Sequence, residues 1–324
     1  MDFVSDNPLI AAFVLSLIGF SVGVCGGFFG VGGAFIVTPA LNVLGFPMIY
    51  AIGTDLAHMA GKSVVATARH RRAGNIDFRA AGLLALGAIP GVRLGNEAIM
   101  ALERVGKTDI WVRFVYIVLL FTLGFFILRE TRRKAGKRAE GTPAGLARIR
   151  IPPIVSLPRS GIAAVSLWIV VGIGILTGFL AGFLGVGGGF IRMPALIYVL
   201  GMPTKMAVGT DLVEVVFSGA YGSYLYGRAG HVDLAAALVM LCGAAFGSHI
   251  GAVAMQYVES SGIRRLFAVT ILGTAVAVTL KQAHLNTAAA IVLFGLGAAV
   301  TATIIFRFVR SLAAIKPAAD ELGG

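Results

Sequence analysis

Long apolar runs alternate with short breaks rich in glycine, proline or charge along almost the whole chain. An apolar helix of roughly 20 residues crosses the hydrocarbon core of a membrane, so the pattern predicts a chain that spans the membrane several times. Each half has five predicted segments, the second of which is short, and one further segment follows them. In chain order the segments are Pro8–Phe28, Gly33–Leu44, Ile49–Ala68, Phe78–Leu102 with a break near Pro90, Trp111–Leu128, Ala163–Phe183, Gly189–Leu200, Lys205–Tyr226, Leu234–Tyr257, Ile263–Leu280 and Thr287–Val309.

The two halves follow one plan. The sequence GFFGVGGAFIVTPALNVLGFP, which starts at Gly27, returns as GFLGVGGGFIRMPALIYVLGMP from Gly182. The glycine cluster and the proline after it recur 155 positions later, whereas the Gly-Thr-Asp element that follows recurs after 156, because one residue is inserted between them. With an odd number of segments in each repeat, the second copy enters the membrane from the opposite side.

We therefore predict an all-α polytopic membrane protein with two inverted five-segment repeats, each with half-helices broken at glycine, and one extra C-terminal helix. The predicted division is residues 1–128 for the first transmembrane repeat, 129–162 for a basic cytoplasmic linker, 163–282 for the second repeat and 283–324 for the extra helix and tail. The linker is assigned because it is rich in Lys, Arg and Pro and shows no apolar periodicity.

The repeated glycine clusters predict helices that end and restart at membrane depth, where free backbone groups must be buried in protein or line a cavity. Matching interruptions in two halves of a membrane protein indicate the substrate site of a transporter. The alternative is that the glycines only permit close helix packing. Their recurrence together with Pro39 and Pro194, and with an acid attached, favours the first interpretation.

Composition supports a membrane protein and excludes a soluble domain, since 57% of the 324 residues are hydrophobic, 13% are charged and the mean hydropathy is +0.90. The net charge of +12 would suggest nucleic-acid binding in a soluble chain. Here the basic residues crowd into a few loops, 19 on one predicted side and five on the other. This asymmetry predicts a cell-membrane protein with its N-terminus outside and its C-terminus in the cytoplasm, and no nucleic-acid partner.

Three cations, Lys62, Arg93 and Arg192, fall inside predicted membrane segments. Ionisable groups at that depth are functional candidates because their exposure to lipid is costly. The buried acids that accompany them are Asp55, Glu97, Asp211 and Glu214. One interpretation is purely structural: Arg93 pairs with Glu97, Lys62 with Asp55 and Arg192 with Asp211, or the two aspartates cap helices.

The functional interpretation starts from the third segment of each repeat. Asp55, His58 and Lys62 are spaced to share one helical face. We predict that the three cations and the helix N-termini give a midplane cavity a positive potential that attracts an anion. The predicted substrate-binding residues are Lys62, Arg93, Arg192, Thr54, Thr210, Ser63, Gly32, Gly33, Gly187 and Gly188, and the predicted coupling or orienting residues are Asp55, Asp211, His58, Glu214, Glu97 and His249.

Chemistry beyond binding is not predicted. Neither a His-Glu-x-x-His nor a Cys-x-x-Cys pattern occurs, and the two cysteines lie at positions that do not match between the repeats. Gly61-Lys62-Ser63 is similar to the end of a phosphate-binding loop, but Leu56 stands where that loop needs its first glycine. We therefore expect no catalytic residues, no metal and no cofactor.

The order of motifs resembles the TauE/SafE sulfite exporter family. The motifs are, in order, the glycine cluster, Phe-Ile-x-x-Pro-Ala-Leu, Leu-Gly-x-Pro, Ala-x-Gly-Thr and an Arg-x-Gly-x-(Val/Ile)-Asp tail. The tail is present at Arg72–Asp77 and Arg228–Asp233, and the resemblance covers residues 20–95 and 175–251. It implies a membrane carrier for small sulfur-containing anions, and its glycine and Gly-Thr motifs fall on 30–33, 185–188, 53–54 and 209–210. This chain departs from the family pattern in the aspartate that follows each Gly-Thr and in its His58/Lys62 stripe.

We expect a secondary transporter, an exporter, of a small sulfur-containing anion such as sulfite or a sulfonate, which works by alternating access. The alternatives are an anion channel and a cation- or proton-coupled carrier of another small organic acid, in which the buried acids bind the ion. The sequence leaves proton or sodium coupling open. Its expected partners are the small anion and the lipid bilayer.

Overall fold

The computed structural model describes residues 7–30, 33–134, 151–258 and 260–321, and nearly all of them are helical. The long helices of the first half are α2 (Pro8–Phe29), α4 (Met48–Arg72), α5 (Phe78–Arg104) and α6 (Thr108–Lys134), and the short α3 (Ala34–Val43) follows the first glycine cluster. In the second half, α7 (Leu167–Leu184) precedes the glycine cluster and α8 (Gly189–Pro194) follows it. The remaining elements are η3 (Ala195–Val199), α9 (Thr204–Arg228), α10 (Leu234–Ala254), η4 (Met255–Tyr257), α11 (Ser260–Gln282) and α12 (Asn286–Glu321).

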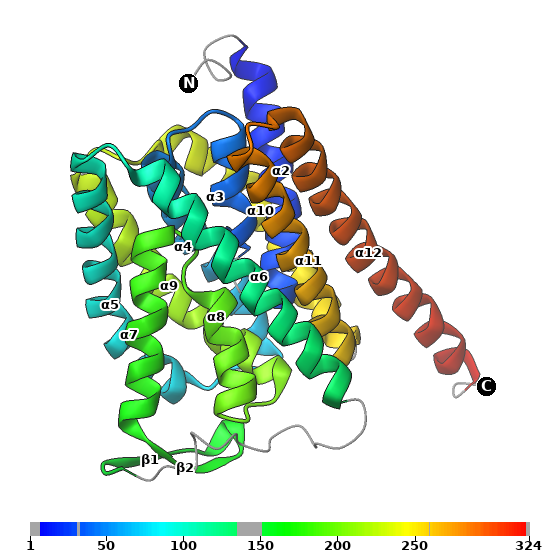
Figure 1. The fold of residues 1–324 in the computed structure, drawn as a ribbon. Helices are drawn as coiled ribbons and strands as arrows, with labels where there is room; N and C mark the ends of the chain where they lie inside the picture. The colour runs from blue at the N-terminus through cyan, green and yellow to red at the C-terminus, as the bar shows by residue number, and fades with distance from the viewer. Residues whose placement is uncertain (1–6, 31–32, 135–150, 259, 322–324) are drawn as a thin grey trace.

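The two halves run in opposite directions. In Figure 1, α2 begins at the top of the view and its counterpart α7 begins at the bottom, next to the hairpin. The halves are also interlocked, because α2 packs along α10, α5 packs along α7, and α4 and α9 cross between them. The predicted inverted repeats with broken half-helices are confirmed.

Glycines explain why α2 lies so close to α10. A Cβ atom on Gly19 would lie 2.0 Å from the carbonyl oxygen of Met240, and one on Gly243 would lie 2.0 Å from that of Ser16. Such contacts repeat every four residues on both helices, as expected for small residues where membrane helices approach closely. The same arrangement joins α5 to α7. The interlocking glycines are Gly19, Gly23, Gly27, Gly243, Gly247 and Gly251 in the first pair and Gly87, Gly91, Gly95, Gly174, Gly178 and Gly182 in the second.

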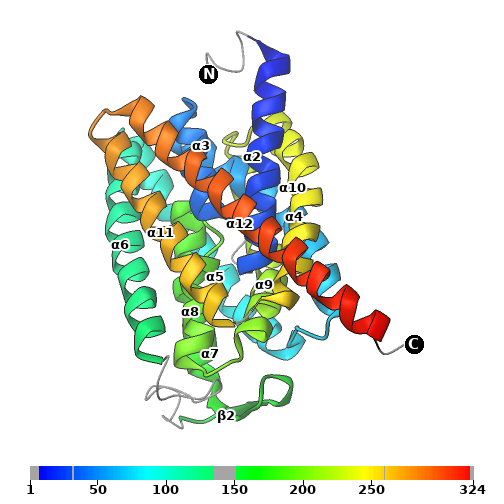
Figure 2. The ribbon, with the colours of Figure 1, turned by 90° about the vertical axis from the view of Figure 1, so that its right-hand side faces the viewer.

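Seven helices among the described residues are long and apolar enough to cross a membrane, namely α2, α5, α6, α7, α11, α12 and the span from Leu234 to Tyr257. The central helices α4 and α9 are not among them, because they carry the buried polar residues. The predicted extra helix is α12, which crosses the outside of the bundle over α2 and α11 (Figure 2).

Three details differ from or refine the prediction. The break expected near Pro90 is wrong, since α5 continues through it; a membrane helix tolerates proline when its surroundings satisfy the freed backbone group. The end of the predicted linker and the first residues of the predicted segment Ala163–Phe183 form a hairpin of β1 (Ile154–Leu157) and β2 (Ile162–Ser166), joined by the short η2 (Pro158–Ser160). The one-residue insertion of the second repeat coincides with the π turn η3, the usual form of an extra residue within a helix.

Candidate functional site

Both predicted helix breaks are present. Gly30 ends α2 with a φ of 77°, and Gly33 opens α3 with a φ of 69°. In the second half Gly185 and Gly188 take the same places with φ values of 77° and 67°. Glycine adopts this left-handed backbone without the steric cost that a side chain brings, so the glycine spacing that the two halves share follows from the turn itself. The predicted site residue Gly32 lies outside the described residues.

Each break packs against the central helix of the other half. A Cβ atom on Gly30 would lie 2.6 Å from the Cα of Val208 in α9, and one on Gly185 would lie 2.8 Å from the Cα of Ile52 in α4. The glycines therefore serve both predicted purposes, since they permit the turn and they permit close packing.

The Gly-Thr elements form a joint between the repeats. The hydroxyl oxygen of Thr54 accepts a hydrogen bond from the backbone N–H of Asp233 at 2.9 Å, and that of Thr210 accepts one from Asp77 at 3.0 Å. Asp77 and Asp233 in turn cap the starts of α5 and α10. Each hydroxyl thus accepts a hydrogen bond from the backbone of the other repeat, and the contact of Thr54 and Thr210 with a ligand stays a prediction.

The second repeat contains a neutralised cation. The guanidinium of Arg192, which is 0% exposed, forms ion pairs with the carboxylates of Asp211 and Glu214. It also donates to the hydroxyl of Thr177 at 3.3 Å and to the carbonyl of Gly187 at 3.0 Å. The structural pairing of Arg192 with Asp211 is thus present, and a second acid joins it. One positive charge faces two carboxylates, so an anion gains little from Arg192 in this state.

The first repeat holds a buried cation without a hydrogen-bond partner among the described residues. Asp55, His58 and Lys62 lie on one buried face of α4, as their spacing predicted, with exposures of 0%, 0% and 1%. Thr38 donates to Asp55 at 2.9 Å, and Nδ1 of His58 lies 3.4 Å from the other carboxylate oxygen. Within the part of the chain that the structure describes, Nζ of Lys62, Nε2 of His58 and Oγ of Ser63 have no hydrogen-bond partner. The expected pairing of Lys62 with Asp55 is therefore absent as a direct contact.

Neither Asp55 nor Asp211 caps a helix. Asp55 lies in the interior of α4 and Asp211 in the interior of α9. A Cβ atom on Gly187 would lie 2.7 Å from the side chain of Met59, which follows His58 on α4. The second break therefore contacts α4 next to the Lys62 cluster (Asp55, His58, Lys62), and the carbonyl of Gly187 accepts from the Arg192 cluster (Arg192, Asp211, Glu214).

Arg93, Glu97 and His249 were expected in the interior, and these positions are wrong. Arg93 and Glu97 pair with each other at 3.0 Å, but their side chains are 67% and 58% exposed, and His249 is exposed as well. The reason is that α5 and α10 turn their glycine faces inward, which leaves the other residues on the outer face. Lys62 and Arg192 are thus buried, whereas Arg93 is not.

Sequence reasoning missed Thr38, Thr177 and Tyr116. Thr38 and Thr177 bond to members of the two clusters, and the hydroxyl of Tyr116 donates to the carbonyl of Leu184 at 3.0 Å, directly before the second break. The available signal was a polar side chain within an apolar run. It is weak, because threonine also bonds to its own helix, as Thr270 and Thr274 do.

Inverted repeats, paired helix breaks and buried charges between them define a polytopic membrane transporter. The chain belongs to the sulfite exporter TauE/SafE family, whose sequence model matches residues 15–280.

Relatives in the family cover most of the chain. The "Probable membrane transporter protein YunE" of Bacillus subtilis is 23% identical over 268 residues, which are 80% of this chain and 94% of the relative. A "Probable membrane transporter protein" of Xylella fastidiosa is 28% identical over 271 residues, 80% of this chain and 90% of the relative. The "Probable membrane transporter protein YjnA" of Bacillus subtilis is 28% identical over 238 residues, which are 72% of this chain and 87% of the relative. No solved structure matches the chain.

Proposed function

We propose that this protein is a secondary transporter, working as an exporter, of a small sulfur-containing anion such as sulfite or a sulfonate, and that the anion binds beside Lys62. The observation that carries the proposal is the ammonium of Lys62, which is 1% exposed and has no hydrogen-bond partner among the described residues. Burying an unpaired charge is costly, so a site of this kind favours a ligand that supplies the opposite charge.

The neighbours of Lys62 suit an oxyanion. Nε2 of His58 lies on the same face of α4 and has no partner among the described residues, and the same holds for the hydroxyl of Ser63. Sulfite and sulfonates carry three oxygens, each of which accepts hydrogen bonds. A charged group held by the ammonium of Lys62, the hydroxyl of Ser63 and, in the tautomer with its proton on Nε2, the ring of His58 would form the short, strong bonds typical of charge-assisted contacts.

The Arg192 cluster is a candidate for the coupling site. Arg192 faces two carboxylates, Asp211 and Glu214, so the cluster has one negative charge in excess when both acids are ionised. A proton or a sodium ion would neutralise it. Because Gly187 touches both Arg192 and Met59, a rearrangement of the second break would change the side-chain packing next to Lys62.

The basic residues at the end of α4 and around the hairpin support an orientation with these loops in the cytoplasm and the N-terminus outside, in the cell membrane. The family assignment and the absence of a catalytic motif in the sequence support transport without chemical change of the substrate.

Reconstituted protein tests the function and the site together. Labelled sulfite should exchange faster when unlabelled sulfite is present on the opposite side, which marks a carrier, whereas an ohmic current would mark the channel alternative. Lys62→Met should reduce exchange at least about tenfold, since a buried charged partner is commonly worth 2 kcal/mol or more.

The matched control is Arg93→Met, which removes the same charge from an exposed site on α5 and should exchange at the wild-type rate. If Lys62→Met is folded by thermal unfolding and still exchanges like the wild type, Lys62 is not the binding site. If the wild type exchanges neither sulfite nor methanesulfonate, the substrate class is wrong.

A further inference from the structure

Helix α5 carries a pair of charged side chains on its outer face, within its membrane span. The helix is one of those long and apolar enough to cross a membrane, and it lies at the edge of the bundle opposite α12 (Figure 1). Arg93 and Glu97 pair with each other at 3.0 Å, with side chains that are 67% and 58% exposed. The pair therefore faces away from the protein, toward whatever surrounds the bundle.

The pair lies too deep to reach water at either end of the helix. Arg93 is two residues past the middle of α5, which runs from Phe78 to Arg104, so it lies about 3 Å from the middle and Glu97 about 9 Å from it. The hydrocarbon core extends roughly 15 Å to either side of the membrane centre. Charged groups at that depth are costly when lipid surrounds them, so this face is expected to be covered by protein.

Pro90 adds an unsatisfied backbone group to the same face. Proline has no N–H, so the carbonyl of Leu86, four residues earlier, lacks its helical hydrogen bond. Leu86 is 66% exposed and Ile89 is 40% exposed, so the described residues leave this side of the helix open. A carbonyl without a partner is unfavourable in hydrocarbon. The continuous course of α5 through Pro90 is a second reason to expect a polar partner here.

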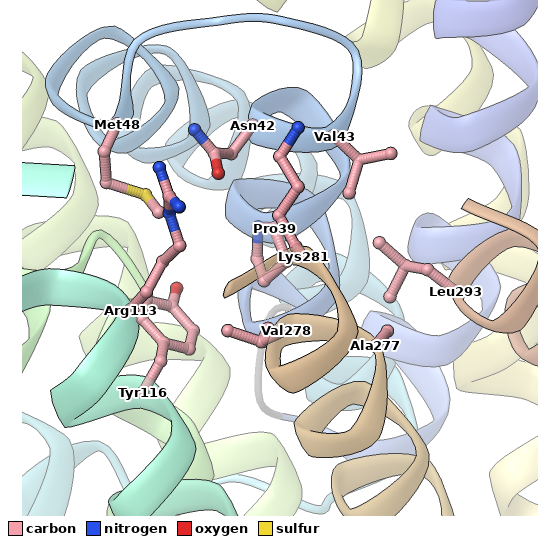
Figure 3. Close-up of a pocket in the computed structure, with 10 residues that line it drawn as sticks. All are labelled: Pro39, Asn42, Val43, Met48, Arg113, Tyr116, Ala277, Val278, Lys281 and Leu293. Carbon is pink, nitrogen blue, oxygen red and sulfur yellow. The ribbon is translucent and has the colours of Figure 1, made fainter. Parts of the chain in front are cut away.

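Arg113 shows how the bundle accommodates an arginine internally. Its side chain on α6 is only 14% exposed, pairs with Asp109 at 2.8 Å and donates to Gln282 of α11 at 3.3 Å. Figure 3 shows its guanidinium turned inward, beside the side chain of Met48. Arg93 has its acid on its own helix instead and is open on the other side.

We propose that the outer face of α5 packs against the same face of a second copy of this chain, so that the protein is a twofold dimer in the membrane. With the axis along the membrane normal, both copies of α5 run in the same direction. Each Arg93 can then bond Glu97 of its own helix and Glu97 of the partner subunit, and the four charges sum to zero. The face is thus complementary to itself, as a twofold interface requires.

The chemistry of this face favours a second copy over lipid. Acyl chains supply neither charge nor hydrogen-bond donors, and lipid headgroups lie roughly 15 Å from the membrane centre. A second copy supplies both at the correct depth. A guanidinium has five N–H donors, more than Glu97 alone can use, so donors remain for a carbonyl such as that of Leu86. Phe217 of the neighbouring α9 is 49% exposed and adds an aromatic side chain of the kind enriched in interfaces.

Counting subunits in liposomes tests this interface. Protein with one fluorescent label at its C-terminus, reconstituted so sparsely that most liposomes are empty, should bleach in two steps. Arg93→Glu places four carboxylates at the interface and Glu97→Arg places four cations there. Because like charges repel, the fraction of two-step spots should fall at least about fivefold in each variant. The double variant Arg93→Glu, Glu97→Arg restores both signs and should restore the two-step spots.

Leu86→Trp tests the interface without changing a charge. The tryptophan is compatible with lipid, so the variant should fold, but its bulk should keep two copies apart and lower the two-step fraction to a similar extent. Ala302→Trp is the control, because it places the same side chain at an exposed position of α12 on the opposite edge. It should bleach like the wild type.

The result does not depend on which solute the protein transports. One-step bleaching of the wild type would assign the α5 face to lipid or to a different protein and would overturn the dimer. Two-step bleaching of Leu86→Trp and of both single charge variants would place the interface elsewhere, which overturns the proposal as well.

Discussion

At the scale of single residues, the two buried cations differ in their partners. Sequence spacing placed Asp55, His58 and Lys62 on one face of α4, and this is correct because helical geometry alone decides it. Spacing could not show that Arg192 is paired with Asp211 and Glu214, because those acids come from α9. Nor could it separate Arg93 from the others, since an apolar run does not tell which face of a helix turns inward.

Loss of Arg192 should destabilise the fold. Arg192→Met leaves the carboxylates of Asp211 and Glu214 buried without their partner, and breaking a buried ion pair in this way typically costs about 3–5 kcal/mol. Thermal unfolding of purified protein in detergent should show a clear drop in melting temperature.

The triple variant Arg192→Met, Asp211→Asn, Glu214→Gln should recover part of that loss, because it removes the uncompensated charges. If the single variant melts like the wild type, the Arg192 cluster does not contribute to stability.

At the scale of elements, the apolar runs gave good helix bounds where a run ends at a glycine turn, as α2 does at Gly30. The change in the repeat offset from 155 to 156 also marks the π turn, since a residue inserted within a half-helix has to be accommodated there. The uninterrupted course of α5 through Pro90 was not predictable in the same way, because it depends on packing against α7. The hairpin also escaped prediction, since the turn between its strands is held by contacts with other segments, among them Ser160 with Asp77 at 2.6 Å.

Helix α7 offers a matched test of the glycine contacts. A Cβ atom on Gly178 would lie 2.3 Å from the carbonyl oxygen of Ala88, whereas one on Gly172 meets nothing within 4 Å. Gly178→Ala should therefore lower the melting temperature, while Gly172→Ala should leave it unchanged or raise it, as alanine favours a helix over glycine by up to about 1 kcal/mol. Similar melting temperatures for the two variants would show that α5 and α7 separate at little cost.

At the scale of the whole molecule, the two halves share one main hydrophobic core. The breaks of each half rest on the central helix of the other, and α2, α5, α7 and α10 make their most extensive packing across the halves. The sequence predicted two repeats but not their interlocking. The glycine spacing is the same on all four interlocking helices, so it does not show which helix packs against which.

Two separately expressed fragments should therefore assemble. If the gene is divided within residues 135–150, between α6 and the hairpin, a tag on one fragment should purify both in equal amounts, and the complex should exchange sulfite. Fragments that purify separately and fail to associate would contradict an interlocked core.

The joint formed by Thr54 with Asp233 and by Thr210 with Asp77 has a consequence for the origin of the chain. Each half supplies one threonine hydroxyl as acceptor and one aspartate N–H as donor, so it carries both partners of the same hydrogen bond. Two copies of one half, inserted in opposite directions, would satisfy both of these bonds as a homodimer. A fused chain of this design needs only a tether between its halves, and residues such as Lys62 and Arg192 can then differ between them.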